Sequence, residues 1–202
     1  WWLLGQLDKK DLMYKGYTIQ PYSPAAGTGL SSHELNQPGC YQNVKDTTVV
    51  AQFKAKANPT LPENTFFIAW TTTPWTLPSN TALCVGPKIE YVLVETFNQY
   101  TFERVKLVLA KNLVSYQFGK NTEQVESTDL LSEYNAGDKS IPFYIAGECT
   151  GKDLEGIKYE QLLPYALPHE DVEKAFQVIL GDFVTTEDGT GIVHIAPTFG
   201  QD

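Results

Sequence analysis

Short runs rich in β-branched and aromatic residues, separated by turn residues, dominate the pattern of hydrophobic positions in this chain. They predict strands at residues 17–22, 47–53, 66–71, 81–85, 91–95, 104–109, 143–147, 175–180 and 182–185. Residues 1–15 and 111–118 have the spacing of amphipathic helices, each ending near a glycine. Residues 23–34 predict a loop, 121–139 a solvated peripheral segment, and 159–165 a docking segment or an edge strand. Many short strands with few helices predict a β-rich α+β fold with a barrel-like core and peripheral helices.

One of these strands leads into an unusual turn. Residues 70–80 read Trp-Thr-Thr-Thr-Pro-Trp-Thr-Leu-Pro-Ser-Asn and follow the apolar run 66–69. Because two prolines so close together cannot continue a central strand, the strand is predicted to end in a hydroxyl-rich turn. Its threonines can donate and accept hydrogen bonds and so suit a polar ligand, although threonines in turns commonly serve only as local caps.

A second stretch, near the other end of the sequence, has the same construction. Residues 187–202 read Glu-Asp-Gly-Thr-Gly-Ile-Val-His-Ile-Ala-Pro-Thr-Phe-Gly-Gln-Asp. A glycine-rich turn leads into a short apolar strand that carries His194, proline and glycine then break the strand, and Asp202 follows. Two strand ends with polar tips predict the two walls of a cleft.

Composition narrows the class of protein. With 202 residues, 42% of them hydrophobic and 19% charged, the chain can bury a core of its own and fits one domain with appendages. It has no apolar run near the length of a membrane span. Its net charge of −9 speaks against strong autonomous binding to a nucleic-acid backbone. The widely spaced Cys40, Cys84 and Cys149 predict buried thiols in a reducing cytosol rather than a metal site.

The two polar stretches together carry a resemblance. Thr-Thr-Thr-Pro-Trp-Thr-Leu-Pro-Ser-Asn at 71–80, followed by Gly-Thr-Gly-Ile-Val-His-Ile-Ala-Pro at 189–197, resembles the editing domain of isoleucyl-tRNA synthetase. That domain is inserted into the Rossmann catalytic core of this class I enzyme. The leucyl and valyl relatives have a sequence similar to Thr-Thr-Arg-Pro at the first motif, with Arg where this chain has Thr73. At the second motif they typically carry Met or Lys where this chain has His194. Thr73 and His194 therefore favour the isoleucyl enzyme.

The resemblance covers nearly the whole chain and implies both its organisation and its activity. It implies a split β-barrel editing domain at 46–202, preceded at 1–45 by a segment that connects it to the catalytic core of a larger synthetase. The implied reaction is hydrolysis of mischarged valyl-tRNA(Ile) by a positioned water, in the cytoplasm. The partners would be the 3′-terminal adenosine of tRNA(Ile) carrying valine and the rest of the synthetase, with no membrane. Editing needs no cofactor, because ATP and Mg belong to the synthetic core.

The resemblance also implies a set of site residues without a metal. The expected catalytic residues are Thr71, Thr72, Thr73, His194 and Asp202. The expected substrate-binding residues are Trp75, Thr76, Asn80, Gly189, Thr190, Gly191, Ala196, Pro197, Thr198 and Phe199. In this interpretation the threonine hydroxyls and the Asn80 amide orient the ester or the water, and His194 contacts the ribose or helps to place the water. Gly189 and Gly191 allow close approach of the backbone.

The ammonium group of the amino acid calls for a carboxylate. In the family an essential aspartate lies nine positions beyond the residue at His194, whereas Asp202 lies eight beyond it. The family aspartate is therefore expected just past Asp202, which is retained as a candidate.

Two alternatives stay open at this point. The chain is either a non-catalytic β-barrel module that binds the tRNA 3′ end or a protein partner, or the equivalent editing domain of a valyl or leucyl enzyme. No Gly-x-Ser-x-Gly elbow or Ser-His-Asp context supports a nucleophilic triad.

Overall fold

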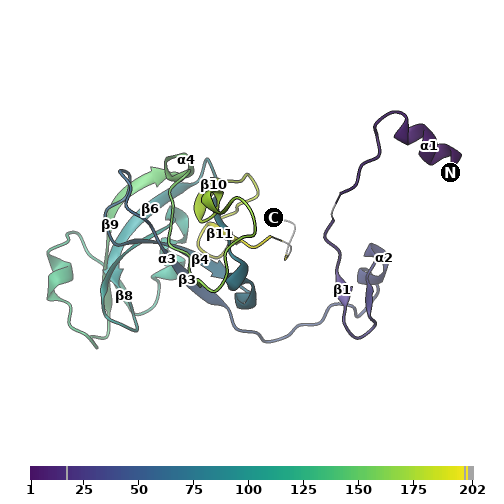
Figure 1. Cartoon of the computed structure of the whole chain (residues 1–202). Coiled ribbons are helices and arrows are strands. Elements are labelled where there is room, and N and C mark those ends of the chain that lie inside the picture. The colour runs from purple at the N-terminus through teal and green to yellow at the C-terminus, as the bar shows by residue number, and fades with distance from the viewer. Residues whose placement is uncertain (17, 198, 200–202) are drawn as a thin grey trace. The chain divides into compact units, whose positions relative to one another are not determined.

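A computed structural model describes residues 1–16, 18–197 and 199 and divides the chain into two compact units. The first comprises residues 1–45 with Phe199, and the second comprises residues 46–197 (Figure 1). Within the described residues, no helix has the length and apolar character needed to cross a membrane. The role of residues 1–45 as a connecting segment stays a prediction.

The first unit contains little regular structure. Its elements are α1 (Trp2–Asp8), β1 (Tyr22–Ser23), β2 (Thr28–Gly29) and α2 (Ser32–Leu35). The predicted helix at 1–15 forms only in its first half, where no residue is buried. The predicted strand at 17–22 is wrong, because only Tyr22 enters a strand, through a two-residue pairing with β2 that follows Pro21. Tyr17 lies outside the described residues. The predicted loop at 23–34 instead contains β2 and the start of α2, which a capping box between Ser31 and Glu34 holds.

The second unit contains the predicted strands. Its elements are β3 (Val49–Lys54), β4 (Thr65–Thr71), η1 (Pro74–Ser79), β5 (Ala82–Val85), β6 (Glu90–Phe97), β7 (Arg104–Ala110), η2 (Lys111–Leu113), α3 (Val114–Gln117), β8 (Thr122–Gln124), η3 (Leu130–Glu133), β9 (Ile141–Thr150), α4 (Gly151–Leu154), η4 (Val172–Lys174), β10 (Gln177–Leu180) and β11 (Ile192–Ile195), where η marks a 3₁₀-helix. Seven predicted strands, from 47–53 to 175–180, are confirmed within a few residues at each end.

Four predictions in this region need correction. The run 182–185 is not a strand, because the chain turns after Gly181 and leaves Phe183 exposed. The segment 121–139 is not wholly solvated, since it contains β8 and the fully buried Leu131. The segment 159–165 makes only an isolated bridge at Tyr159. Among the cysteines Cys40 is exposed and Cys149 half-buried, so only Cys84 is buried as expected.

The strands of the second unit form two mixed sheets. The larger has the order β3-β4-β7-β6-β9-β8, and the smaller has the order β10-β5-β11. The pairs β4–β7, β8–β9 and β10–β5 are parallel and the other pairs antiparallel. The β-rich fold with few short helices is thus confirmed. The sheets do not close into a barrel within the described residues, so the predicted barrel is not confirmed.

The alternation of side chains along β4 places it between two hydrophobic clusters. Phe67 and Ala69 pack into the main core together with residues of the smaller sheet, such as Leu83 and Ile192. Ile68 lies in a second cluster with Leu107 and other residues. Because both faces of β4 are covered, the position of its last residue, and of the turn that follows, is fixed.

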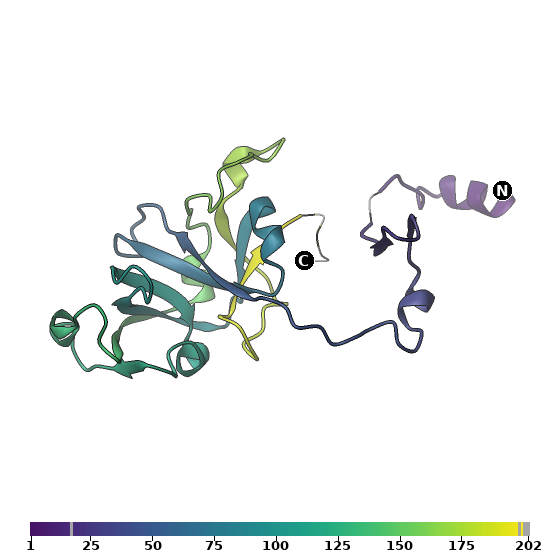
Figure 2. The same ribbon diagram turned by 90° about the horizontal axis from the view of Figure 1, so that it is seen from below.

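The smaller sheet brings the two polar stretches of the sequence together. β11 pairs with β5, so that His194 lies opposite Leu83 and Ile195 opposite Ala82. The backbone N–H of Thr81 donates to the Ile195 carbonyl at 2.9 Å, just after η1 ends. Figure 2 shows η1, in blue, beside the yellow β11. A strand end and a 3₁₀-helix from the first stretch therefore adjoin a strand from the second.

Candidate functional site

A cavity of about 400 Å³ lies where the two polar stretches meet. We call it the threonine pocket. Its lining residues are Trp70, Thr71, Thr72, Thr73, Phe183, Thr185, Asp188, Gly189, Thr190, Ile192, Val193 and His194. The two predicted walls thus form one cavity, with Thr71–Thr73 at the end of β4 on one side and 188–194 on the other.

Hydrogen bonds order the hydroxyls along the first wall. Thr76 Oγ1 lies 2.7 Å from the Thr73 carbonyl, which can only accept, so the Thr76 hydroxyl proton is committed there. Thr73 Oγ1, 3.3 Å from Thr76 Oγ1, must then be the donor in that contact. Thr71 Oγ1 accepts from the Thr73 backbone N–H at 3.1 Å and lies 3.3 Å from Thr73 Oγ1. The order Thr71 to Thr73 to Thr76 satisfies every contact, and all three hydroxyls are committed within the turn.

Thr72 differs from its neighbours in this turn. Its side chain is exposed, lines the pocket and has no hydrogen-bond partner in the described part of the chain. Among the three consecutive threonines, Thr72 therefore keeps a hydroxyl that can donate to a ligand and accept from it.

The same logic fixes the state of His194. Its Nε2 lies 3.2 Å from Thr76 Oγ1, whose proton is already used, so Nε2 carries the hydrogen and donates. The other ring nitrogen, Nδ1, is buried and has no partner among the described residues. Burial lowers the pKa of His194 below its ordinary value, which keeps the ring neutral at pH 7. His194 thus holds Thr76, and through it the order of the threonine hydroxyls.

Two glycines shape the second wall. Gly189 has φ +71°, and a Cβ there would lie 3.1 Å from Trp70 Cε3 across the pocket wall. Gly191 has φ +72°, and its Cβ would lie 2.4 Å from the Cβ of Ala110. Side chains at these positions would be strained in the left-handed region and would push into neighbours. The glycines therefore allow the turn to lie against β4 and β7.

Side chains from the segment between β7 and β8 brace this turn from outside. Asn112 Nδ2 donates to Thr186 Oγ1 at 2.8 Å, and Gln117 Nε2 donates to the Gly189 carbonyl at 2.9 Å. The Ala110 N–H also donates to the Thr190 carbonyl at 2.9 Å. The second wall is therefore fixed to the larger sheet, as the first wall is.

The structure does not bring all the predicted site residues into the pocket. Thr76 and Gly191 are buried behind its surface, whereas Trp75 is exposed and, like Ala196 and Pro197, is not a lining residue. Phe199 is exposed and belongs to the other unit. Thr198 and Asp202 lie outside the described residues.

Asn80 occupies a structural position rather than a place in the pocket lining. It is buried, and its Oδ1 accepts from the Tyr159 hydroxyl at 2.7 Å. Its Nδ2 donates to the Ala82 carbonyl at 2.9 Å and to the Ile195 carbonyl at 3.4 Å. Both ends of the amide are thus used to join the end of η1 to the smaller sheet.

Several lining residues were not singled out from the sequence. They are Trp70, Phe183, Thr185, Asp188, Ile192 and Val193. Asp188 is the acidic residue of the pocket lining and is exposed. Its place directly before Gly189 was the available signal, because a residue next to a turn that forms a pocket wall has access to that pocket. Within the described residues, no cluster of His, Cys, Asp and Glu could hold a metal ion.

Comparison with known proteins assigns the chain to a family. It is 64% identical over 207 residues to the isoleucine–tRNA ligase of Bacteroides fragilis and 63% identical over 202 residues to that of Cytophaga hutchinsonii, in each case over 100% of this chain. The chain belongs to the isoleucine–tRNA ligase family. The ligase of Clostridium tetani is 44% identical, again over 100% of this chain. The chain spans only 16–18% of the length of these ligases. No protein-family model matches the chain.

Solved structures from leucyl-tRNA synthetases align with part of the chain. The editing domain of the P. knowlesi cytosolic enzyme aligns with a TM-score of 0.47 at 14% identity, covering 73% of this chain and 55% of that one. The crystal structure of GlLeuRS-CP1 aligns with a TM-score of 0.46 at 16% identity, covering 73% and 54%. Structural similarities with these TM-scores and sequence identities do not assign a function to this chain.

Proposed function

We propose that this chain is the post-transfer editing domain of an isoleucine–tRNA ligase and that the threonine pocket hydrolyses valyl-tRNA(Ile). The observation that carries the proposal is the meeting of Thr71–Thr73 with His194 in one cavity, from stretches more than 100 residues apart. We take the two sheets that share the main core as the split barrel of such a domain. In this proposal the partners are the 3′-terminal adenosine of the tRNA, carrying valine, and the rest of the synthetase in the cytoplasm.

The need for such a site is physical. A binding pocket separates isoleucine from valine by one methylene, which is worth only about 1–3 kcal/mol. A second pocket that admits valine and excludes isoleucine raises the accuracy by sieving on size. The alternative of a leucyl or valyl enzyme is disfavoured, because the relatives compared above are isoleucine–tRNA ligases.

The proposed reaction adds water to the ester carbonyl carbon and breaks the bond between that carbon and the ribose oxygen. The ribose oxygen leaves with a proton, and free valine is released. Thr72, with its uncommitted hydroxyl, orients the ester or the water. His194 acts through Thr76 by fixing the turn, because its buried Nδ1 offers no free base to the cavity. The neighbouring hydroxyl of the ribose assists the water, and no cofactor takes part.

The ammonium group of valine needs a carboxylate in this proposal. Asp188 lines the threonine pocket, whereas Asp202 lies one position before the place where the family pattern has its aspartate and is retained as the second candidate. Asp188→Asn and Asp202→Asn, each in the full synthetase, separate the two candidates. The variant that raises KM for valyl-tRNA(Ile) identifies the ammonium partner.

The test of the activity is deacylation of valyl-tRNA(Ile) by the full synthetase. Thr72→Ala and His194→Ala are each expected to slow deacylation by about a hundredfold, since loss of one positioned group commonly costs that much. Thr128→Ala, an exposed threonine outside the pocket, is the matched control and leaves the rate unchanged. If neither pocket variant slows the reaction, the threonine pocket is not the hydrolytic site. Binding of a valyl-adenosine analogue without hydrolysis would instead identify a non-catalytic module.

A further inference from the structure

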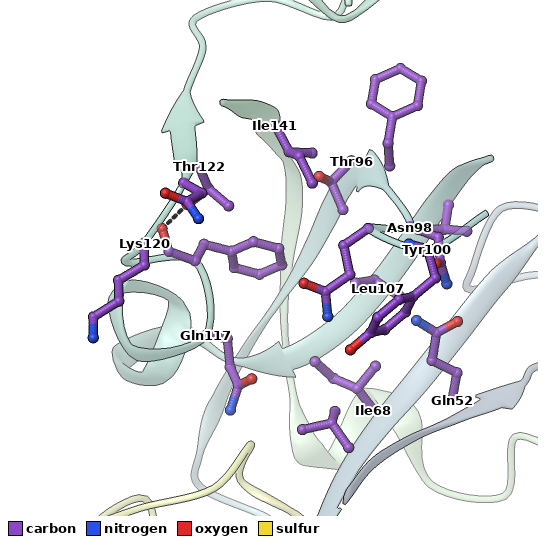
Figure 3. A pocket seen from close by; sticks show the side chains of 16 residues that line it. Gln52, Ile68, Thr96, Asn98, Tyr100, Leu107, Gln117, Lys120, Thr122 and Ile141 are labelled. Atoms are coloured by element: carbon purple, nitrogen blue, oxygen red, sulfur yellow. Dashed lines mark hydrogen bonds between the residues drawn. The ribbon is translucent and has the colours of Figure 1, made fainter. Parts of the chain in front are cut away.

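A second cavity, of about 260 Å³, lies beside the hairpin between β6 and β7, over a face of the larger sheet to which all six strands contribute lining residues. Figure 3 shows Gln52, Asn98 and Tyr100 on one side of it and Lys120 and Thr122 on the other. Apolar residues such as Ile68 and Leu107 also line it. We call it the carboxamide cavity, because five of its lining residues are amides, namely Gln52, Asn98, Gln99, Gln117 and Asn121.

The lining suits a planar polar ligand. Several carboxamides offer paired donors and acceptors, and the side chains of Gln52, Gln99 and Asn121 have no hydrogen-bond partner in the part of the chain that the structure describes. Apolar residues offer a surface for a flat ring. Although the protein has 24 acidic residues, none of them lines this cavity, whereas Lys120 does. The cavity therefore favours a neutral ring attached to an anionic group.

The hairpin turn presents an aromatic ring at this cavity. Asn98 Oδ1 accepts from the backbone N–H groups of Tyr100 and Thr101, at 2.9 and 3.1 Å, which fixes the turn. Tyr100 is 81% exposed, although it lines the cavity. Because few protein atoms cover the ring of Tyr100, a nucleobase of a ligand can stack on it.

One residue joins this cavity to the threonine pocket. Gln117 lines the carboxamide cavity, and its Nε2 donates at 2.9 Å to the carbonyl of Gly189, which lines the threonine pocket. Gln117 therefore connects the lining of the carboxamide cavity to the turn that forms the second wall of the threonine pocket. A chain molecule with one end in the threonine pocket can place its next unit in the carboxamide cavity.

We propose that the carboxamide cavity binds the nucleotide that precedes the terminal adenosine of the tRNA. The inference rests on the proposed function, which places the adenosine end in the threonine pocket. Carboxamides hydrogen-bond the edges of nucleobases, aromatic rings stack on their faces, and a lysine pairs with the phosphate. The same features explain how a protein of net charge −9 holds an RNA end, because recognition comes from bases rather than from a basic surface.

The experiment measures binding of the chain to three probes by calorimetry: adenosine, the dinucleotide cytidylyl-adenosine, and cytidine monophosphate. The dinucleotide is expected to bind about tenfold more tightly than adenosine, the gain from stacking one more base. Tyr100→Ala removes that gain and leaves adenosine binding unchanged. Tyr116→Ala, an exposed tyrosine on α3 outside the cavity, is the matched control and keeps the gain.

Each other result overturns the inference in a different way. Equal affinity for adenosine and the dinucleotide, or a gain that survives Tyr100→Ala, overturns it and leaves the proposed function intact. Cytidine monophosphate binding as tightly as the dinucleotide would identify a site for free nucleotides instead. Absence of binding by all three probes, together with unchanged deacylation in the Thr72→Ala synthetase, would overturn the inference and the proposed function together.

Discussion

His194 Nε2 donates a hydrogen bond to Thr76 Oγ1 at 3.2 Å, and these two residues are 118 positions apart in the sequence. The Thr76 hydroxyl in turn donates to the Thr73 carbonyl at 2.7 Å. The contact therefore joins β11 to the 3₁₀-helix that follows β4, and it transmits the position of His194 to the threonine turn. We assign His194 to the frame of the pocket, because its Nε2 is bonded to Thr76 and its unpaired Nδ1 is buried.

The first prediction separates the Thr76 hydroxyl from the shape of its side chain. Thr76→Val leaves the part-buried Nε2–H of His194 unpaired and is expected to lower the free energy of unfolding by about 1–3 kcal/mol. In the full synthetase it is expected to slow deacylation of valyl-tRNA(Ile) about a hundredfold by shifting the turn. Thr76→Ser keeps the hydroxyl and retains activity. Urea unfolding and the deacylation assay measure the two effects.

A double variant tests whether the two residues act as one unit. Because Thr76→Val and His194→Ala remove the same contact, their effects on deacylation are expected to be less than additive when combined. Additive losses would show that His194 serves the reaction independently of Thr76.

Most of the strands could be predicted because the pattern that identifies them is local. Alternation or a short apolar run marks β4 and β6, for example, whatever they pair with. The run at 182–185 has the same local pattern, but the chain turns after Gly181 and the run pairs with no strand among the described residues. Sequence periodicity does not report which strands become neighbours, so neither that error nor the separation into two open sheets could be seen beforehand.

The threonine pocket was predicted in its two walls but not in its details. The sequence indicates Thr71–Thr73 and His194 because they lie in two turn-and-strand stretches that together resemble a family motif. Asp188 lines the pocket but carries no distinctive signal in the sequence, because acidic residues are ordinary in turns. The structural role of Asn80 cannot be predicted from the sequence, because nothing nearby in the chain reveals its hydrogen bond with Tyr159, 79 positions away.

A second prediction concerns the dependence of stability on pH. Burial lowers the pKa of His194, so the folded chain holds a proton on this ring less readily than the unfolded chain. The stability that comes from the neutral ring is present above the unfolded pKa of about 6.5 and is lost as the pH falls from there toward the lower folded pKa.

Urea unfolding at about pH 7.5 and about pH 5 is the measurement, with His194→Gln as the comparison. The wild type is expected to lose more stability than His194→Gln over this interval, because glutamine does not titrate. An equal loss in both would show that other groups account for the pH dependence.

A third prediction assigns Asn80 to stability. Asn80→Ala leaves the buried Tyr159 hydroxyl without its acceptor and removes the side-chain hydrogen bonds to the Ala82 and Ile195 carbonyls, of which the Ile195 carbonyl still accepts from the Thr81 N–H. The expected cost is about 1–3 kcal/mol in the free energy of unfolding. Tyr159→Phe removes only one hydroxyl and is expected to cost less. The double variant Asn80→Ala with Tyr159→Phe is expected to be more stable than the sum of the two single changes predicts. Both groups of the Tyr159–Asn80 hydrogen bond are then absent, so neither is left buried without its partner.

The fourth prediction separates backbone strain from steric contact at the glycine turn. Gly191 and Gly156 have similar positive φ angles, +72° and +77°, but only Gly191 faces a close neighbour, the Cβ of Ala110. Gly156→Ala is expected to cost about 1–2 kcal/mol from the left-handed backbone alone. Gly191→Ala is expected to cost more, because its Cβ would lie only 2.4 Å from that of Ala110.

Removing the neighbour isolates the steric part. In the double variant Gly191→Ala with Ala110→Gly, the contact is gone but the φ angle is unchanged, so the cost is expected to fall toward that of Gly156→Ala. A glycine inside β7 itself costs about 0.5–1 kcal/mol in the free energy of unfolding. The single variant Ala110→Gly measures this cost, which is then subtracted from that of the double variant. If adding Ala110→Gly does not restore any of the stability that Gly191→Ala loses in urea unfolding, the contact with the Cβ of Ala110 does not account for the cost of that substitution.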